Sequence, residues 1–166
     1  MVRKGERILD VGCGPGHYTT ALEAGELQAV GLDLSLGMLR QAQEKEVARL
    51  VQADMRRLPF ADGCVTGCFV CASLLHLPRH QVPQALLEFH RVLCYNGALY
   101  VGVKEGTGAE RIADQEGYER FFTYYRPKEI DRLVEAAGFQ IVDGWISPPG
   151  EGQRHRWINR FAVAQG

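Results

Sequence analysis

Three glycines alternate in the segment Asp10-Val11-Gly12-Cys13-Gly14-Pro15-Gly16, directly after the apolar residues Ile8 and Leu9. Glycine allows a positive φ and lets a ligand approach the main chain closely. Pro15 suits the first turn of a helix, because its fixed φ and missing N–H cost little there. The start of a helix offers unpaired backbone N–H groups to a carboxylate or a phosphate. The segment therefore predicts a strand-to-helix turn that holds a nucleoside-type cofactor.

Asp33 ends a second apolar segment, Gln28–Leu34, and is the next residue suited to this chemistry. A carboxylate at the tip of the second strand can accept hydrogen bonds from both hydroxyls of a ribose. Such charge-assisted bonds are roughly twice as strong as neutral ones. The alternative role is capping of the following helix, for which Ser35 is better suited. We therefore predict that Asp33 binds ribose.

The glycine spacing distinguishes between cofactors. A dinucleotide site requires G-x-G-x-x-G, whose third glycine would fall on His17, whereas this chain has G-x-G-x-G and no phosphate-binding lysine nearby. With these motifs the chain resembles the class I S-adenosylmethionine-dependent methyltransferases. It is most similar to the small-molecule, methyltransferase type 11-like group, whose first motif reads LDxGCGxG. The resemblance implies S-adenosylmethionine as cofactor and S-adenosylhomocysteine as product.

The resemblance also implies roles for individual residues. The acid matching Asp10 helps to hold the ammonium group of the cofactor, often through water, although a cap for the loop is an alternative. Leu34 and Met38 would form apolar walls for the adenine, with packing of the helix core as a competing role for Met38. In the family's third motif, the acid matching Asp54 accepts a hydrogen bond from the adenine amino group. The backbone N–H of Met55 would contact the ring, and the alternative is a polar turn.

The segment Val70–Pro78 matches the family's fourth motif, where carbonyls near Cys71 and Ala72 face the methionine part of the cofactor. His76 is a candidate general base, because its ordinary pKa lies near neutrality. A structural histidine is an open alternative, since methyl transfer from a sulfonium depends largely on proximity and alignment. The predicted cofactor-binding set is Asp10, Gly12, Cys13, Gly14, Gly16, Tyr18, Asp33, Leu34, Met38, Asp54, Met55, Cys71 and Ala72, with His76 as the predicted catalytic residue and no metal site.

Strands that alternate with helices predict the elements that position these residues. The expected strands are Arg7–Val11, Gln28–Leu34, Ala48–Ala53, Val65–Cys71, Ala98–Val103, Phe139–Ile146 and His155–Val163. The expected helices cover about Gly16–Ala24, a segment after Ser35, Gln81–Leu93 and a segment that begins at Pro127 and stops at Gly138. The short loop between the last two strands favours an antiparallel pair. The predicted fold is an α/β, three-layer Rossmann-like sandwich with a seven-stranded, mostly parallel sheet and a terminal antiparallel strand.

The connecting segment Glu105–Arg126 contains the aromatic run Phe121-Phe122-Thr123-Tyr124-Tyr125. These side chains could form the wall of a substrate pocket, or they could simply cover the sheet. The sequence favours neither alternative.

Composition supports a single domain that covers residues 1–166. A net charge of −1 gives no reason to expect nucleic acid or a membrane as partner, and the five cysteines do not form a disulfide pattern. We therefore expect a cytoplasmic protein with a small-molecule acceptor, for which a homodimer is an open possibility. The first strand begins close to Met1, so the helices that usually precede it in the family, and cover the cofactor, are expected to be lacking. A non-catalytic binding module and, less favoured, an NAD-dependent oxidoreductase are the alternatives.

Overall fold

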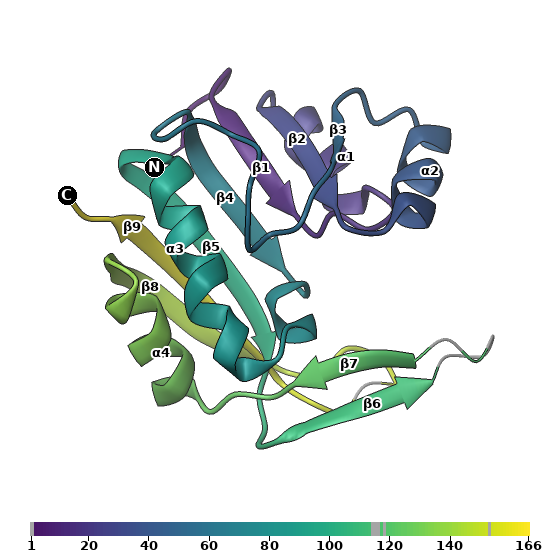
Figure 1. Cartoon of the computed structure of the whole chain (residues 1–166), viewed down its shortest axis with the longest axis vertical. Coiled ribbons are helices and arrows are strands. Elements are labelled where there is room, and N and C mark those ends of the chain that lie inside the picture. The colour runs from purple at the N-terminus through teal and green to yellow at the C-terminus, as the bar shows by residue number, and fades with distance from the viewer. Residues whose placement is uncertain (1, 114–116, 118, 153) are drawn as a thin grey trace.

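The computed structural model describes residues 2–113, 117, 119–152 and 154–166 of the chain. Its main feature is a seven-stranded sheet with the strand order β3-β2-β1-β4-β5-β9-β8 (Figure 1). Neighbouring strands from β3 to β5 are parallel, and β9 runs antiparallel to both β5 and β8. The predicted fold class is confirmed. The strands of this sheet are β1 (Arg7–Val11), β2 (Gln28–Asp33), β3 (Leu50–Gln52), β4 (Val65–Cys71), β5 (Leu93–Lys104), β8 (Phe139–Ser147) and β9 (Trp157–Ala164).

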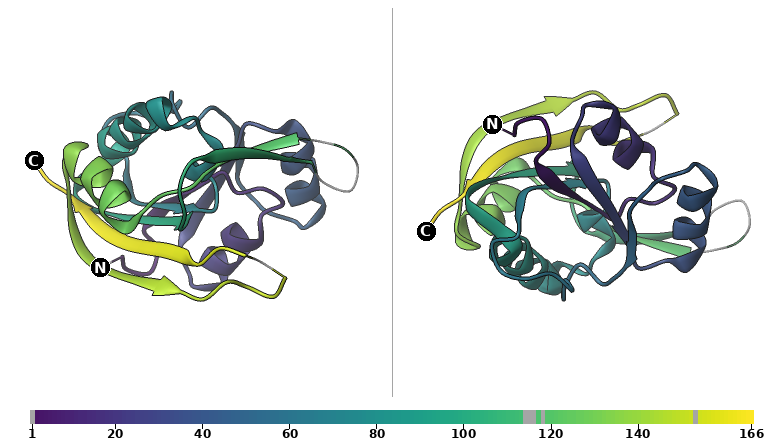
Figure 2. Two further views of the ribbon diagram at one scale, coloured as in Figure 1. Left: turned by 90° about the horizontal axis from the view of Figure 1, so that it is seen from below. Right: turned by 90° about the horizontal axis from the view of Figure 1, so that it is seen from above.

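Helices lie on both faces of the sheet, with α3 and α4 on one face and α1 on the other (Figure 2). Helix α3 forms because Val82, Ala85, Leu86 and Phe89 recur at helical spacing, and all four are fully buried. They pack against core residues of β4 and β5, such as Val101. The helical elements are α1 (His17–Ala24), α2 (Leu36–Glu44), η1 (Leu74–His76), η2 (Arg79–Gln81), α3 (Val82–Val92) and α4 (Pro127–Ala136).

An aromatic row crosses the sheet on the side of α1. Strand register places Phe69, Tyr100 and Phe161 side by side on β4, β5 and β9. The ring centres are 4.7 Å apart for Phe69 and Tyr100, and 5.1 Å apart for Tyr100 and Phe161. Tyr18 of α1 continues the row at 5.1 Å from Phe69, and Trp145 of β8 lies 5.8 Å from Phe161. The sheet thus carries apolar side chains on both faces, as is typical of parallel sheets.

Two strands differ from their predicted lengths by three residues or more, and β2, β8 and β9 differ by one residue each. The expected strand Ala48–Ala53 is reduced to the three residues of β3, whereas β5 begins at Leu93, directly after α3. Leu93 pairs with Val65, but the next pair joins Ala98 to Gly67, so the chain between them is looped out of register. Asn96 takes a left-handed φ of 59° within this loop. The Asn-Gly pair therefore makes a bulge inside a longer strand.

The sequence did not predict the hairpin of β6 (Ala109–Ala113) and β7 (Glu119–Thr123), nor the short helices η1 and η2. The hairpin lies beyond the ends of β4 and β5 (Figure 1). An isolated two-stranded hairpin is marginally stable, so its attachment matters. The hydroxyl of Thr123 donates to the Leu77 carbonyl at 2.8 Å, and the Arg79 guanidinium donates to the Tyr124 carbonyl at 2.7 Å. These bonds fix β7 against η1 and η2.

Candidate functional site

The glycine loop joins β1 to α1 at the carboxyl edge of the sheet, where ligands bind in open α/β folds. Gly12, Gly14 and Gly16 have φ values of 72°, 53° and 80°, so all three are left-handed. A Cβ at Gly12 would lie 2.3 Å from the Ser73 Cβ, and one at Gly16 would lie 2.6 Å from Val47 Cγ2. A Cβ at Gly14 would meet nothing within 4 Å. The outer two glycines are thus required for packing, whereas Gly14 faces open space that a ligand can use.

Asp33 connects the tip of β2 to this loop. Its Oδ2 accepts from the Gly14 backbone N–H at 3.0 Å, and its Oδ1 accepts from the Ser35 N–H at 2.8 Å. A carboxylate offers about four acceptor positions, so each oxygen retains capacity for a further donor. Ser35 is the N-cap of α2, as predicted, because its hydroxyl accepts from the Met38 N–H at 3.3 Å. The carboxylate of Asp33 therefore lies beside the open space at Gly14, where a diol could reach it.

Asp10 is buried at the end of β1, with 2% of its surface exposed. The Thr19 hydroxyl donates to its Oδ2 at 2.6 Å, and burial raises the pKa of Asp10 to about 6. The bond from Thr19 opposes this shift, and the negative charge of Asp33 adds to it. The sequence analysis did not identify Thr19 as a partner of Asp10. Its position near the start of the helix that follows the glycine loop could have indicated this. A buried carboxylate whose donors, the Thr19 hydroxyl and backbone N–H, are both neutral is suited to pairing with a cation.

We expect the affinity for S-adenosylhomocysteine to depend on Asp10 and on pH. The ammonium group of the ligand favours the ionised carboxylate, which the free protein holds above a pKa of about 6. Below that pH the carboxyl must lose a proton when the ligand binds. Calorimetric titrations should therefore show a roughly tenfold loss of affinity between pH 7 and pH 5.

Thr19→Val provides the matched control for this pH dependence. Removal of the hydroxyl takes away the bond that lowers the Asp10 pKa, so the midpoint should move to higher pH. An affinity that stays constant from pH 5 to pH 8 in the unaltered chain would contradict a direct role for Asp10.

Leu34 and Met38 are predicted to line the adenine. Leu34 is 63% exposed and Met38 is 38% exposed, so neither side chain belongs to the core. The inward face of α2 is made by Leu39 and Ala42, which removes helix-core packing as the role of Met38. The Gln52 side-chain amide donates to the Leu34 carbonyl at 3.1 Å and holds the ends of β2 and β3 together.

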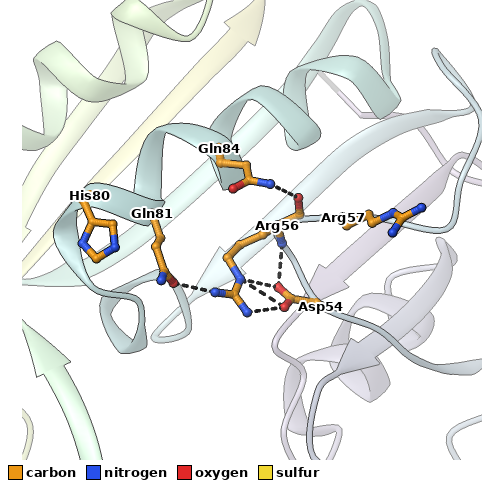
Figure 3. A pocket seen from close by; sticks show the side chains of 6 residues that line it. All are labelled: Asp54, Arg56, Arg57, His80, Gln81 and Gln84. Atoms are coloured by element: carbon orange, nitrogen blue, oxygen red, sulfur yellow. Dashed lines mark hydrogen bonds and ion pairs between the residues drawn. The ribbon is translucent and has the colours of Figure 1, made fainter.

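Asp54 has a partner that the sequence analysis did not find. Its carboxylate accepts from the Arg56 guanidinium, with Nε 2.9 Å from Oδ1 and 3.0 Å from Oδ2 (Figure 3). This arginine holds the pKa of Asp54 below its usual range. Arg56 also donates to Gln81 Oε1 at 2.6 Å, so the loop after β3 is tied to η2 beside a hollow of about 480 Å³. An adenine amino group would have to share the Asp54 oxygens with Arg56.

The remaining predicted residues near the loop are Cys13, Tyr18, Met55, Cys71 and Ala72. Cys13 is 7% exposed with its sulfur against β2, and burial raises its pKa to about 12, so it is a neutral thiol. Met55 packs against the core cluster. Ala72 has a φ of 55° and donates its N–H to the Gly102 carbonyl at 3.0 Å, which turns the chain at the end of β4. The Tyr18 hydroxyl is hydrogen-bonded to the Cys71 thiol.

His76 ties η1 to the hairpin. Its Nδ1 lies 2.7 Å from the Phe121 carbonyl, which can only accept, so Nδ1 carries a proton. Its ring packs edge-on against Phe122, with 4.7 Å between ring centres. Burial lowers the pKa of His76 below its usual value, although the hydrogen bond to Phe121 opposes this shift. The imidazole is therefore neutral near pH 7, and its Nε2 is available as an acceptor.

Within the part of the chain that the structure describes, no group of three or more His, Cys, Asp or Glu side chains is arranged to hold a metal ion. None of its helices combines the length and the apolar character needed to cross a membrane.

Comparison with known proteins agrees with this geometry. Residues 9–101 match the family model Methyltransf_11, a methyltransferase domain. A demethylmenaquinone methyltransferase of Staphylococcus aureus is 39% identical over 83% of this chain and 69% of its own length. The chain therefore belongs to the S-adenosylmethionine-dependent methyltransferases of class I, in the type 11-like group.

One further relative is similar to this chain in sequence, and one solved structure is similar to it in fold. A malonyl-[acyl-carrier protein] O-methyltransferase of Legionella pneumophila is 40% identical over 56% of this chain. A methyltransferase structure from Methanosarcina mazei superposes with a TM-score of 0.89 over 99% of this chain and 94% of that one, at 17% identity. The chain spans about a third of the length of the first curated relatives that it matches.

Proposed function

We propose that this chain transfers a methyl group from S-adenosylmethionine to a small-molecule acceptor. The observation that carries the proposal is the pairing of Asp33 with the open space at Gly14, on the carboxyl edge of the sheet. Family membership supports the same cofactor. We further propose that residues 1–166 form one methyltransferase domain, that it acts in the cytoplasm, and that it can form a homodimer.

The residues of the chain would bind and align the reactants. S-adenosylmethionine, when bound, supplies a sulfonium-activated methyl group. In this proposal Asp33 holds the ribose hydroxyls, Asp10 pairs with the ammonium group, and Leu34 with Met38 lines the adenine. The backbone at Cys71 and Ala72 would face the methionine part of the cofactor.

His76 is the proposed general base for acceptors that carry a proton. Its neutral ring and fixed Nδ1–H leave Nε2 as the proton acceptor, which supports this role. Alignment alone can suffice for acceptors that are already anionic.

The acceptor class is proposed from the relatives. Demethylmenaquinone and a malonyl thioester are the acceptors named for two of them. Both are small acceptor groups, and the formal charge of −1 supports no general attraction to nucleic acid.

The test is a transfer assay with isotope-labelled S-adenosylmethionine and a panel of quinol, thiol, amine and carboxylate acceptors. Labelled product from the purified chain supports the proposal. Binding of the cofactor without transfer to any acceptor would favour the non-catalytic binding module. The oxidoreductase alternative is set aside, because the chain belongs to the methyltransferase family.

A further inference from the structure

One cation and two aromatic rings meet where β5 ends and the hairpin docks. Lys104 is the last residue of β5, and its Nζ lies 4.5 Å from the centre of the Phe122 ring and 5.8 Å from that of Trp157. The His76 ring contacts the same Phe122. We call Lys104, Arg120 and Phe122 the cationic corner. It lies beside the edge of the sheet at which the proposed cofactor site is built.

Arg120 belongs to this corner because of strand geometry. Side chains two positions apart on a strand share a face, so Arg120 and Phe122 point to the same side of β7. Burial is the largest cause that lowers the pKa of Lys104 and of His76. The positive charge of Arg120 lowers both pKa values further. Two positive charges therefore act on the space around His76.

Two acids, Glu110 and Asp33, act on this corner through their charge, and each already accepts a hydrogen bond from another group. Glu110 lies opposite Phe122 in the hairpin register, and its carboxylate accepts from the Tyr124 hydroxyl. The negative charge of Asp33 raises the pKa of His76 slightly against the larger effect of burial, and Asp33 Oδ2 accepts from the Gly14 N–H. Among the described residues, no Asp or Glu oxygen lies within 4.0 Å of the Lys104 or Arg120 nitrogens. The corner thus has a positive charge without a paired carboxylate.

We propose that the cationic corner binds a carboxylate of the methyl acceptor, an inference that rests on the proposed function. Arg120 offers the planar donor fork that matches a carboxylate, and Lys104 offers a point charge. The buried Phe122 ring and the Trp157 ring lie beneath the Lys104 ammonium, so the surroundings of this charge are apolar. The proposed substrate class is therefore small aryl or alkyl carboxylic acids.

The test compares matched acids and amides in the presence of saturating S-adenosylhomocysteine. Phenylacetate and 1-naphthoate are titrated by ligand-observed NMR against phenylacetamide and 1-naphthamide. The unaltered chain should prefer each acid by about tenfold, as expected for a charged hydrogen bond. Lys104→Met keeps the apolar stem over Phe122 and should reduce the preference to about threefold or less. Combination with Arg120→Gln should remove it.

Two further variants separate a specific site from general charge. Lys104→Arg restores the charge and should restore the preference. Lys128→Met removes an exposed lysine on α4 and should leave the preference unchanged. Unchanged affinity of each variant for S-adenosylhomocysteine is the measure of its folding.

Equal binding of acids and amides by the unaltered chain, or binding of neither, would overturn the inference. An equal loss of preference in Lys128→Met would overturn it too. Failure of the proposed function is a different result, because the unaltered chain would then not bind S-adenosylhomocysteine at all.

Discussion

Asp33→Ala is expected to weaken S-adenosylhomocysteine binding by at least about a hundredfold while the chain stays folded. The substitution removes two charge-assisted hydrogen bonds to the ribose, each contributing about 1.5–3 kcal/mol. It also removes the bonds to the Gly14 and Ser35 N–H groups, which lie near solvent and contribute little to the free energy of unfolding. Calorimetric titration measures the affinity, and thermal unfolding measures the stability.

Asp143→Ala is the matched control for this experiment. Asp143 is a carboxylate that likewise accepts a backbone N–H, from Gly144 at 2.8 Å, but it is exposed and lies on the edge strand β8. The Asp143→Ala variant should bind S-adenosylhomocysteine with unchanged affinity. Normal binding by Asp33→Ala as well would show that the ribose has been placed wrongly.

Gly14→Ala and Gly12→Ala should separate the binding role of the loop from its packing role. The new methyl group at Gly12 would lie 2.3 Å from the Ser73 Cβ, so Gly12→Ala should lower the free energy of unfolding by about 3 kcal/mol or more. At Gly14 the methyl group meets nothing within 4 Å, and only the left-handed φ costs about 1–2 kcal/mol. Gly14→Ala should therefore fold but fill the space that the ligand needs.

Urea unfolding and calorimetric titration of both variants give the comparison. The expected pattern is a stable Gly14→Ala chain with at least about tenfold weaker binding, and a destabilised Gly12→Ala chain. Unchanged affinity in Gly14→Ala would mean that the open space beside the loop is not the cofactor site.

The parallel sheet could be predicted because its signals are local. The strand Val65–Cys71 and the apolar stripe of α3 each depend on residue spacing within one segment, and both were found where expected. The loop Gly12–Gly16 was identified in the same way. The structure shows which of its glycines are closely packed. Gly12 lies against Ser73 and Gly16 against Val47, and these contacts cannot be seen in the sequence.

The hairpin could not be predicted from its own residues. Strand β6 is exposed along its whole length, so it shows no alternation of buried and exposed positions. The stability of the hairpin comes from contacts of β7 with Leu77, His76 and Arg79, which are distant in sequence. For the same reason the sequence could not decide whether Phe122 covers the sheet or faces a site.

The pairing of Asp54 with Arg56 was also beyond the sequence. Arg56 and Arg57 are adjacent, and only the turn after β3 determines which of them reaches the carboxylate. Residue type and spacing thus identified Asp54 as a candidate, whereas its pairing with Arg56 depends on how the loop folds.

Calorimetric titration of the purified chain with S-adenosylhomocysteine tests the central claim most directly, with NADH titrated in parallel. We expect one site of about micromolar affinity, near −8 kcal/mol, and no binding of NADH. Absence of S-adenosylhomocysteine binding by a chain that unfolds cooperatively would contradict the assignment of the glycine loop and Asp33 as the cofactor site.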